Sequence, residues 1–482
     1  MSLSNAINVA RTGLQASGLR ADIVATNVAN ASTPGYVRRS VLLSESVAGG
    51  STTGVGSDGI ARSNDAALTA QRQGLTSDLA QASLIASTWQ SLSARLGDTV
   101  DGTGLFNLMS GFESALSAAA ASPESSVNAN GVIDAAKAIV NEFRGLSQYI
   151  TSERAEADLE IASGVETVNA ALKQIEALNA KIASTDKSSS KAAALFDERQ
   201  RVVDTISEYL PVETIERQNG AVDVMTKEGV FLVSGSARQI EFSASNTFGP
   251  SATLENGQLS GLSVDGLDLT PGASAYSAIS SGLFGALFTL RDNELPNFSD
   301  QLDTVAADLV SRLSADDVDP TKPAGGFGLF VDPAPTAGAG LAGRISINAA
   351  VDPAQNGSLS RLRDGLGAST PGAVGNNSIL SAMLNAVTDA RSINSEGLQG
   401  SFSIAELTAA LASRAGQNRV GSESILASTS AQHAIASEAE QSQTGVDVDQ
   451  QMQDLLLIEQ AYAANARVIE IANQMLQRLM EI

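Results

Sequence analysis

Both ends of this 482-residue chain carry apolar side chains at alternating steps of three and four residues, which is the spacing of a heptad repeat. This spacing predicts two amphipathic helices, each with a narrow apolar seam. A single seam fits an ordinary core equally well, but two seams at opposite ends favour pairing with each other. The predicted seam residues, which form the candidate assembly interface, are Leu3, Ile7, Leu14, Val24, Val28, Leu455, Ile458, Tyr462, Asn465, Ile469, Leu476 and Leu479.

The charges of the two ends also favour their pairing. Residues 1–39 hold four arginines and one aspartate, a net charge of +3. Residues 446–482 hold six carboxylates and two arginines, a net charge of −4. Opposite charges attract the two arms to each other, within one subunit or between subunits, and like arms repel.

The N-terminal seam is too poor in large side chains to order its arm alone. Five Leu, Ile or Val side chains contribute about 7–15 kcal/mol of gross burial. Ordering about 30 residues costs ~1–2 kcal/mol each for the backbone. We therefore expect both arms to be largely disordered in the free monomer and to fold on assembly.

Composition excludes several classes of function. A formal net charge of −23 argues against a nucleic-acid partner and against adsorption to anionic lipid. The chain has no cysteine and one histidine, so disulfides, thiolate metal sites and two-histidine metal sites are impossible. No apolar run approaches the ~20 residues that span a bilayer, so membrane insertion is not expected. The N-terminus lacks the pattern of a cleavable signal peptide, and composition alone suggests a cytoplasmic protein.

Three motifs could in principle belong to a cofactor, metal or catalytic site, but a structural explanation fits each of them better. The GxGxxG string at 338–343 follows Asp-Pro-Ala-Pro rather than a strand, so a flexible loop fits it better than a dinucleotide site. The aspartates at 316–319 lack the glycine and terminal glutamate of a calcium loop. His433 lies in a Ser/Ala-rich helical stretch with no second histidine. We predict no catalytic residues, no cofactor and no metal, and we expect the protein not to be an enzyme.

Between the arms, the patterns change from helix to strand and back. Gly- and Ser-rich residues 40–65 are expected to be extended, and strand-like runs separated by Asn219-Gly220 and Glu228-Gly229 predict hairpins within 211–278. The predicted fold class is mainly α: a discontinuous terminal α-helical coiled coil plus a long-helix bundle, with an inserted β-rich outer domain. The predicted domains are a terminal coiled coil (1–40 and 445–482), a helical domain (41–210, 280–320 and 376–444), a β-rich insertion (211–279) and a Pro/Gly-rich segment of uncertain fold that can belong to the outer domain (321–375).

Two coupled signatures at the ends resemble one known family. The stretch from Asn27 to Tyr36, NVANASTPGY, resembles the ANN-type, TPGY/F signature of flagellar rod, hook and hook-associated proteins. Val446 to Ile482 resembles the matching terminal helix of these axial proteins. The family-signature turn comprises Thr33, Pro34, Gly35 and Tyr36, and we expect it to set the angle between the inner arm and the outer domain.

The middle of the chain narrows the resemblance. Leu195 to Thr214 is similar to the helix-to-strand passage of hook-associated proteins at the hook–filament junction, and Gly282 to Pro296 resembles their next helix. The resemblance implies unfolded export through the flagellar type III channel without a cleaved signal peptide. It also implies assembly outside the cell as a layer that adapts hook to filament. The implied partners are further copies in a ring-like homo-oligomer, hook protein, a second junction protein or filament subunits, and an export chaperone.

Two other readings stay open on the sequence. Hook or distal-rod proteins share the terminal signatures but should lack the long helical middle. A secreted coiled-coil adhesin is less favoured, because it leaves the coupling of the TPGY turn to the C-terminal seam unexplained.

Overall fold

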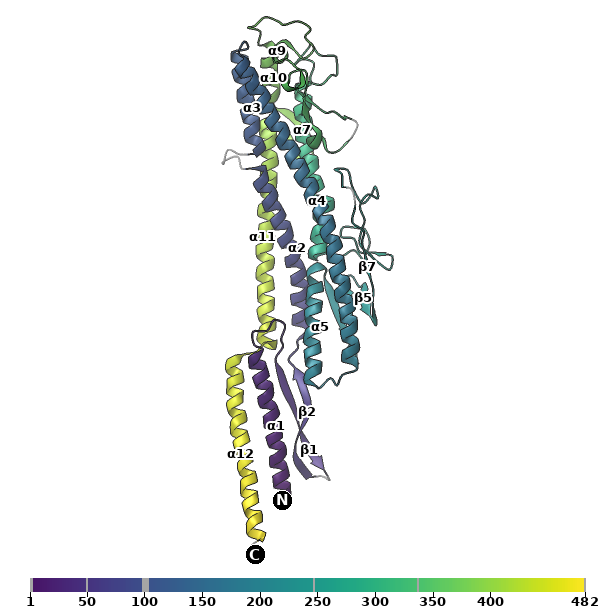
Figure 1. Ribbon diagram of the computed structural model, residues 1–482, viewed down its shortest axis with the longest axis vertical. Coiled ribbons are helices and arrows are strands. Elements are labelled where there is room, and N and C mark those ends of the chain that lie inside the picture. Colours follow the sequence, from purple (N-terminus) through teal and green to yellow (C-terminus); the bar gives the residue numbers. More distant parts are fainter. Residues whose placement is uncertain (1–2, 49–50, 98–103, 246–247, 336–337, 481–482) are drawn as a thin grey trace.

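The computed structural model describes residues 3–48, 51–97, 104–245, 248–335 and 338–480, which form one elongated molecule with both ends of the chain at the same pole (Figure 1). The fold is mainly α, as predicted. The helices are α1 (Leu3–Ala29), α2 (Ala66–Leu96), α3 (Gly104–Ala121), α4 (Ser126–Ala183), α5 (Ser190–Tyr209), α6 (Gly282–Thr289), α7 (Leu295–Leu313), α8 (Leu341–Arg344), α9 (Ser360–Asp364), α10 (Ser378–Thr388), α11 (Ile404–Thr444) and α12 (Val448–Met480), with a π turn η1 (Leu290–Glu294) and a 3-10 turn η2 (Pro353–Gln355).

The strands are short and antiparallel. They form three two-stranded sheets, one of four strands (β3-β4-β5-β6) and one of three (β7-β8-β9) within the described residues. Their bounds are β1 (Arg39–Ala48), β2 (Ser51–Arg62), β3 (Val212–Glu216), β4 (Val222–Thr226), β5 (Phe231–Ser234), β6 (Ser236–Ala237), β7 (Ile240–Glu241), β8 (Ser263–Val264), β9 (Leu267–Asp268), β10 (Phe330–Val331), β11 (Ser346–Ile347), β12 (Arg391–Ser395) and β13 (Leu398–Phe402).

The 58-residue helix α4 is the frame of the body, by which we mean residues 66–444. The Ser125 hydroxyl caps its first turn by accepting the Asn128 amide at 3.2 Å. Apolar residues then recur at steps of three and four from Val132 to Ile182, so that one face stays buried along a helix of roughly 85 Å. The helix therefore connects two cores.

The two cores lie one above the other along α4. The upper core packs α3, α7, α10 and the start of α11 against the first half of α4, and Trp89 meets Phe298 edge to face at 6.0 Å there. Trp89 is a core residue and not a ligand platform. The lower core packs α5, α6 and the strands β3–β8 against the second half of α4. Neither core contains a described residue of α1 or α12.

The predicted strand region has the predicted hairpins. β3 and β4 are joined across Asn219-Gly220, and Gly220 has a φ of +83° that glycine adopts without strain. β4 and β5 are joined across Glu228-Gly229, where Gly229 has a φ of +92°. The 321–375 segment, for which no fold was predicted, folds as β10, α8, β11, η2 and α9 around one end of α7 and α10 (Figure 1).

The hairpin β1–β2 lies within the range predicted as the helical domain 41–210, and it packs along α1. The physical reason is the close approach of the two elements: a Cβ at Gly54 would lie 2.1 Å from the Thr12 Oγ1. We call α1, α12 and the hairpin β1–β2 the terminal rod. No helix among the described residues is long and apolar enough to span a bilayer.

A fully buried ion network ties the lower core to α4. The Arg291 guanidinium, 0% exposed, donates to Asp158 on α4 at 2.6 Å and to its neighbour Asp292 at 2.8 Å. Arg154, also on α4, donates to the Arg291 carbonyl at 2.8 Å and to two carbonyls of the 250–252 loop. Because each of these charged side chains is hydrogen-bonded, to a counter-charge or to backbone carbonyls, the network fixes how the β-rich region meets α4.

We expect Arg291→Ala to destabilise the body by about 3–5 kcal/mol, because Asp158 would be left buried without a counter-charge. Chemical denaturation followed by circular dichroism measures the loss. The double variant Arg291→Met, Asp158→Leu should lose less than the single one. Arg238→Ala is the matched control, since its ion pair with Asp265 is more than a third exposed on both sides and contributes less than ~1 kcal/mol. Equal losses in the two single variants would contradict this account.

Candidate assembly interface

Helices α1 and α12 pair along their length at the lower pole of the molecule (Figure 1). The two chain ends thus meet within one subunit. Gly13 allows the close approach, because a Cβ there would lie 2.8 Å from the Asn465 Nδ2. On α12, Ile458 and Ala472 are 3% exposed and lie on the side that faces α1.

The predicted seam residues are only partly brought together. On α1, Val24 is buried, and Leu3, Ile7, Leu14 and Val28 are half-buried between α12 and the hairpin. The remaining predicted residues lie on α12. There Ile458 is buried, Leu455, Asn465 and Ile469 are half-buried, and Tyr462, Leu476 and Leu479 are exposed.

The contact between the two helices is thin. Among the described residues of α12, only Gln451, Ile458 and Ala472 are buried. The expected attraction between the arms does not take the form of ion pairs: in the described rod, both ion pairs go to Asp197 on α5, and none joins α1 to α12. Such a contact buries little of the apolar surface that α12 carries.

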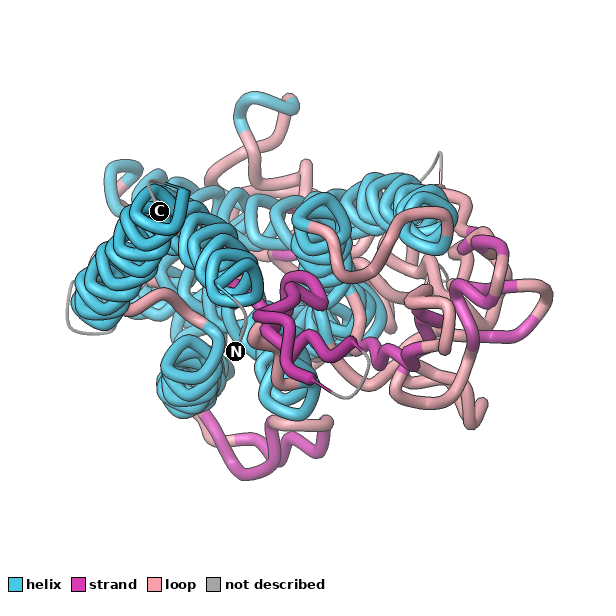
Figure 2. Tube along the Cα trace, turned by 90° about the horizontal axis from the view of Figure 1, so that it is seen from below, coloured by secondary structure: helices cyan, strands magenta, loops and turns pink. Residues whose placement is uncertain are grey.

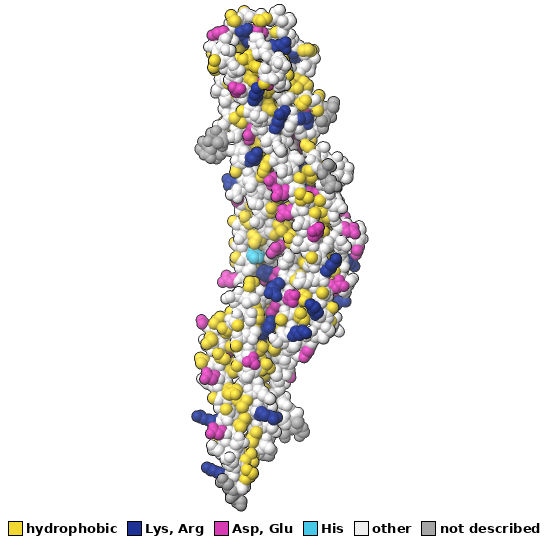
Figure 3. Space-filling model, viewed as in Figure 1, with side chains coloured by type: hydrophobic (Ala, Val, Ile, Leu, Met, Phe, Trp, Pro, Cys, Tyr) yellow, Lys and Arg dark blue, Asp and Glu magenta, His cyan; other side chains and the backbone are white. Residues whose placement is uncertain are grey.

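A second apolar stripe on α12 lies to one side of the face that contacts α1, and sequence reasoning missed it. At about 100° per residue it lies roughly a quarter-turn from the seam. No charged residue interrupts it, and Figure 3 shows apolar side chains gathered over this flank. We call it the outer stripe; all of its members are exposed, and they are Leu457, Ala461, Ala464, Val468, Ile471 and Met475.

Asn27 holds the terminal rod together where it meets the body. Its side chain is 1% exposed, and its amide uses all of its main hydrogen-bonding directions. The Nδ2 group donates to the Arg39 carbonyl and to Gln451 Oε1, both at 2.8 Å. The Oδ1 atom accepts the Tyr36 hydroxyl at 2.8 Å and the Arg39 amide at 3.0 Å. One side chain thus joins the end of α1, the signature turn, β1 and the start of α12.

The same point is clamped to the body by Asp197 of α5. Its carboxylate accepts Arg39 Nη2 at 2.8 Å and Arg62 Nε at 2.6 Å, so both strands of the hairpin are tied to α5. The Arg39 guanidinium also lies 4.8 Å from the ring centre of Tyr36. Burial raises the pKa of Tyr36, and the charge of Arg39 opposes that shift. We call Asn27, Tyr36, Arg39, Arg62, Asp197 and Gln451 the joint.

The signature turn makes the joint compact. Thr33, Pro34 and Gly35 are exposed, whereas Tyr36 is half-buried and points back to Asn27. Gly35 has a φ of +72°, and a Cβ there would lie 2.6 Å from the Arg201 Cγ. A residue with a side chain would therefore be strained in conformation and in space. Sequence reasoning found the turn but missed Asn27 and Asp197 as its partners, although Asn27 opens the quoted motif.

The motifs set aside on sequence have structural roles. In the GxGxxG string, the amides of Gly340 and Ala342 donate to Asp303, so they are not free to bind phosphate. His433 Nε2 lies 3.1 Å from the Thr76 hydroxyl between α11 and α2. In the described part of the chain, no group of three His, Cys, Asp or Glu residues could hold a metal ion.

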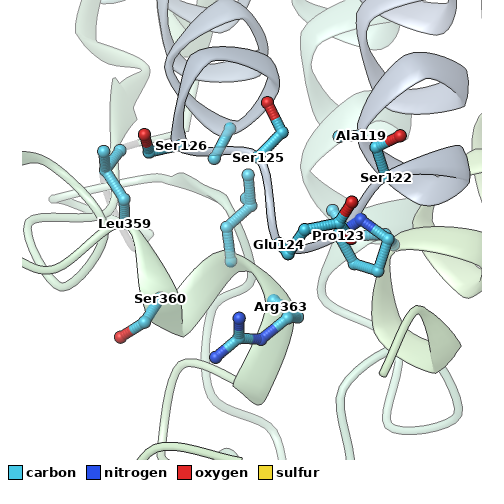
Figure 4. A pocket seen from close by; sticks show the side chains of 12 residues that line it. Ala119, Ser122, Pro123, Glu124, Ser125, Ser126, Leu359, Ser360 and Arg363 are labelled. Carbon is cyan, nitrogen blue, oxygen red and sulfur yellow. The ribbon is translucent and has the colours of Figure 1, made fainter. Parts of the chain in front are cut away.

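A small cavity of about 140 Å³ opens at the far pole, between the α3–α4 turn and α9 (Figure 4). Ser125 and Ser126 line one side of it, and Arg363 lines the other. The Arg363 guanidinium is bound to Asp364 at 2.7 Å, so it is not free to hold an anion.

Three family models match separate parts of the chain. Residues 7–36 match the flagella basal body rod protein model, and residues 441–482 match the C-terminal model of the flagellar basal body rod FlgEFG proteins. Residues 90–316 match the helical domain of the flagellar hook-associated protein FlgK. The two terminal matches cover most of α1 and all of the described α12, and the third covers much of the body.

Individual relatives share one name. Flagellar hook-associated protein 1 of Salmonella typhimurium is 26% identical over 250 residues, which are 49% of this chain and 44% of the relative. The Escherichia coli K12 protein of that name is 23% identical over 63% of this chain and 55% of its own length. The one from Bacillus subtilis is 20% identical over 98% and 97%. The chain thus matches less than half the length of the Salmonella relative.

A solved structure, that of the flagellar hook junction protein FlgK from Burkholderia pseudomallei, aligns with a TM-score of 0.44 and 21% identity over 54% of this chain and 46% of the other. The matches at both termini are to models of flagellar basal body rod proteins, so the ends of the chain are similar to those of flagellar axial proteins. Within that class, residues 90–316 are similar to the helical domain of FlgK, and the similarity over nearly the whole chain is to flagellar hook-associated protein 1.

We expect Asn27→Ala to loosen the joint, because it leaves the Arg39 amide and the Gln451 side chain without a buried partner. The loss of about 1–3 kcal/mol should speed amide hydrogen exchange at Arg39 by roughly tenfold or more. Asn30→Ala is the control, since Asn30 bonds only within its own turn, to Thr26 and Thr33. Unchanged exchange at Arg39 in Asn27→Ala would rule out this role.

Proposed function

We propose that this protein is a structural component of the bacterial flagellum that forms the layer between hook and filament. It assembles with further copies of itself through the terminal rod and performs no catalysis. The observation that carries the proposal is the outer stripe of α12, an apolar surface that the described chain leaves uncovered. Contiguous exposed apolar surface of this kind marks an interaction site. The similarity to flagellar hook-associated proteins supports the same role.

In this proposal the terminal rod and the body occupy different layers of the flagellum. Residues 1–40 and 445–482 line the inner tube, the helical domain forms the outer wall, and the β-rich insertion 211–279 faces solvent. Compared with the predicted domains, only one assignment changes: the hairpin β1–β2 belongs to the terminal rod instead of the helical domain. The joint supports this division, because it fixes the direction of the rod with buried hydrogen bonds while leaving the outer stripe free.

The partners in this role are hook protein on one side and a second junction protein or filament subunits on the other. An export chaperone would hold the C-terminal helix before assembly. The protein would reach the cell exterior through the flagellar type III channel, without a cleaved signal peptide. A net charge of −23 favours a chain that stays monomeric until it meets a growing flagellum.

The second candidate is another axial protein, of the hook or the distal rod. It is supported by the terminal family matches, which carry the names of rod proteins. The long helical body with its match to the FlgK helical domain argues for the junction instead. A secreted adhesin is less well supported, because it gives no reason for the matches at both termini.

We expect Ile469→Asp to block incorporation into flagella without unfolding the body. Ile469 is half-buried on the side of α12 that faces α1, and no α12 residue in the described chain belongs to either core. Ile469→Leu is the matched control and should be mild, because it conserves apolar volume. Thermal melting of the monomer and immunoblots of isolated flagella give the two measurements. Ile469→Asp subunits in intact junctions would refute this use of α12.

Deletion of the gene in the source bacterium tests the function itself. The expected strain makes hooks without filaments and sheds flagellin into the medium, both visible by electron microscopy and immunoblot. Restoring the full chain from a plasmid should restore filaments. A strain that lacks hooks altogether would favour the hook or rod alternative, and a strain with normal filaments would contradict both.

A further inference from the structure

The methionines of the body and those of the terminal rod differ in their access to solvent. No described methionine of the body is exposed, and Met109 and Met383 of the upper core are 0% exposed. Three others are exposed, and all three lie on α12. They are Met452, which is 48% exposed, Met475, 52%, and Met480, 80%. The thioether sulfurs that solvent can reach in the described chain are therefore gathered on one helix of the rod.

Met475 is the methionine of the outer stripe. It follows Leu457 by 18 residues, or about five turns, so the two side chains lie on one line along α12. Met452 precedes Leu457 by five residues and Met480 follows Met475 by five, which turns each of them about 140° around the helix. Met452 and Met480 thus point away from the outer stripe, although both are exposed.

The structure leaves the Met475 sulfur open to small molecules. Among the described elements, α12 packs extensively only against α1, and it lies at the edge of the molecule when the rod is viewed from below (Figure 2). The other members of the outer stripe are hydrocarbon side chains without a readily oxidised atom. The chain has no cysteine, so no thiol competes with the methionines for an oxidant.

We propose that Met475 is a reversible oxidation site that controls whether the outer stripe can be buried on assembly. Hydrogen peroxide transfers one oxygen atom to the thioether sulfur, which is oxidised by two electrons, and the other peroxide oxygen leaves as water. Methionine sulfoxide reductases reverse the change: a dithiol is oxidised to a disulfide, and the sulfoxide oxygen leaves as water. This inference rests on the proposed function and adds chemical control of the surface that carries it.

Oxidation would change the rod and spare the body. The sulfoxide oxygen accepts hydrogen bonds, and burying such a group without a donor is unfavourable. The outer stripe itself offers only hydrocarbon side chains, so a sulfoxide at Met475 opposes its burial. Met109 and Met383 lie in a closed core that peroxide does not enter while the body is folded. An oxidised copy therefore stays folded but assembles poorly.

The variant Met475→Gln tests the effect of polarity in cells. Glutamine resembles methionine sulfoxide in length, carries an uncharged oxygen and has the helix propensity of methionine. In the deletion strain, this variant should enter flagella about tenfold less than the wild-type chain. Met452→Gln is the matched control, because Met452 has nearly the same exposure on another side of α12. Equal incorporation of the two variants would overturn the proposal.

Hydrogen peroxide tests the reaction itself. Peptide mass spectrometry of the treated wild-type chain should find sulfoxide at Met475 and none at Met109 or Met383, with an unchanged circular dichroism spectrum. The treated chain should sediment with hooks isolated from the deletion strain about tenfold less than the untreated chain. A methionine sulfoxide reductase supplied with a dithiol should restore its binding.

The variant Met475→Leu assigns the effect to one sulfur. Its binding to isolated hooks should be the same before and after peroxide treatment, because leucine cannot form a sulfoxide. Met452→Leu and Met480→Leu should each lose binding on treatment as the wild-type chain does. A treated Met475→Leu chain that loses as much binding as the treated wild type would overturn the proposal.

The two proposals fail in different ways. A wild-type chain that carries sulfoxide at Met475 and still binds hooks as well as the untreated chain would overturn the oxidation site while leaving the junction role intact. An untreated wild-type chain that neither binds isolated hooks nor enters flagella would overturn the junction role and this inference with it.

Discussion

A buried amide must satisfy its donors and its acceptor, because each one left unpaired costs about 1–3 kcal/mol. Asn27 meets this requirement with groups from three other segments of the chain, namely the Tyr36 hydroxyl, the Arg39 backbone and Gln451 of α12. Asp197 then fixes the hairpin to α5 through two arginines. The direction of the terminal rod relative to the body follows from these few bonds, since the α1–α12 contact buries little on its own.

The body and the rod differ in how complete their packing is. Helix α4 carries two closed cores whose large side chains are almost all buried. The ion pair of Arg291 with Asp158 of α4 restrains how the segments of the body pack against this helix. The rod, in contrast, leaves the outer stripe in solvent. The body of such a chain is fully packed, so it can stay folded as a monomer. Its rod still exposes apolar surface, so apolar burial increases when copies meet. This difference suits a protein that is stable before assembly and specific during it.

The sequence predicted the helices, the β-rich insertion and the pairing of the ends, because each depends on a local period or a local turn. It indicated the seam of α12 that lies towards α1 but not the outer stripe beside it, because the outer stripe has no partner within the chain. It placed residues 41–62 with the helices because a Gly- and Ser-rich strand has no apolar periodicity that would indicate which element it packs against. Asn27 and Asp197 escaped notice because their partners lie far away in sequence, so no spacing reveals them.

The joint and the outer stripe serve one purpose in the proposed assembly. Contacts between side-by-side rods repeat correctly only if every rod leaves its body at the same angle, because errors of direction accumulate around a ring. Asn27 and Asp197 supply that constancy with short, buried, directional bonds. An apolar stripe imposes direction less strictly than hydrogen bonds do, so it can tolerate small differences between neighbours. A rigid joint inside each subunit and a more adaptable contact between subunits would let one layer fit two different lattices.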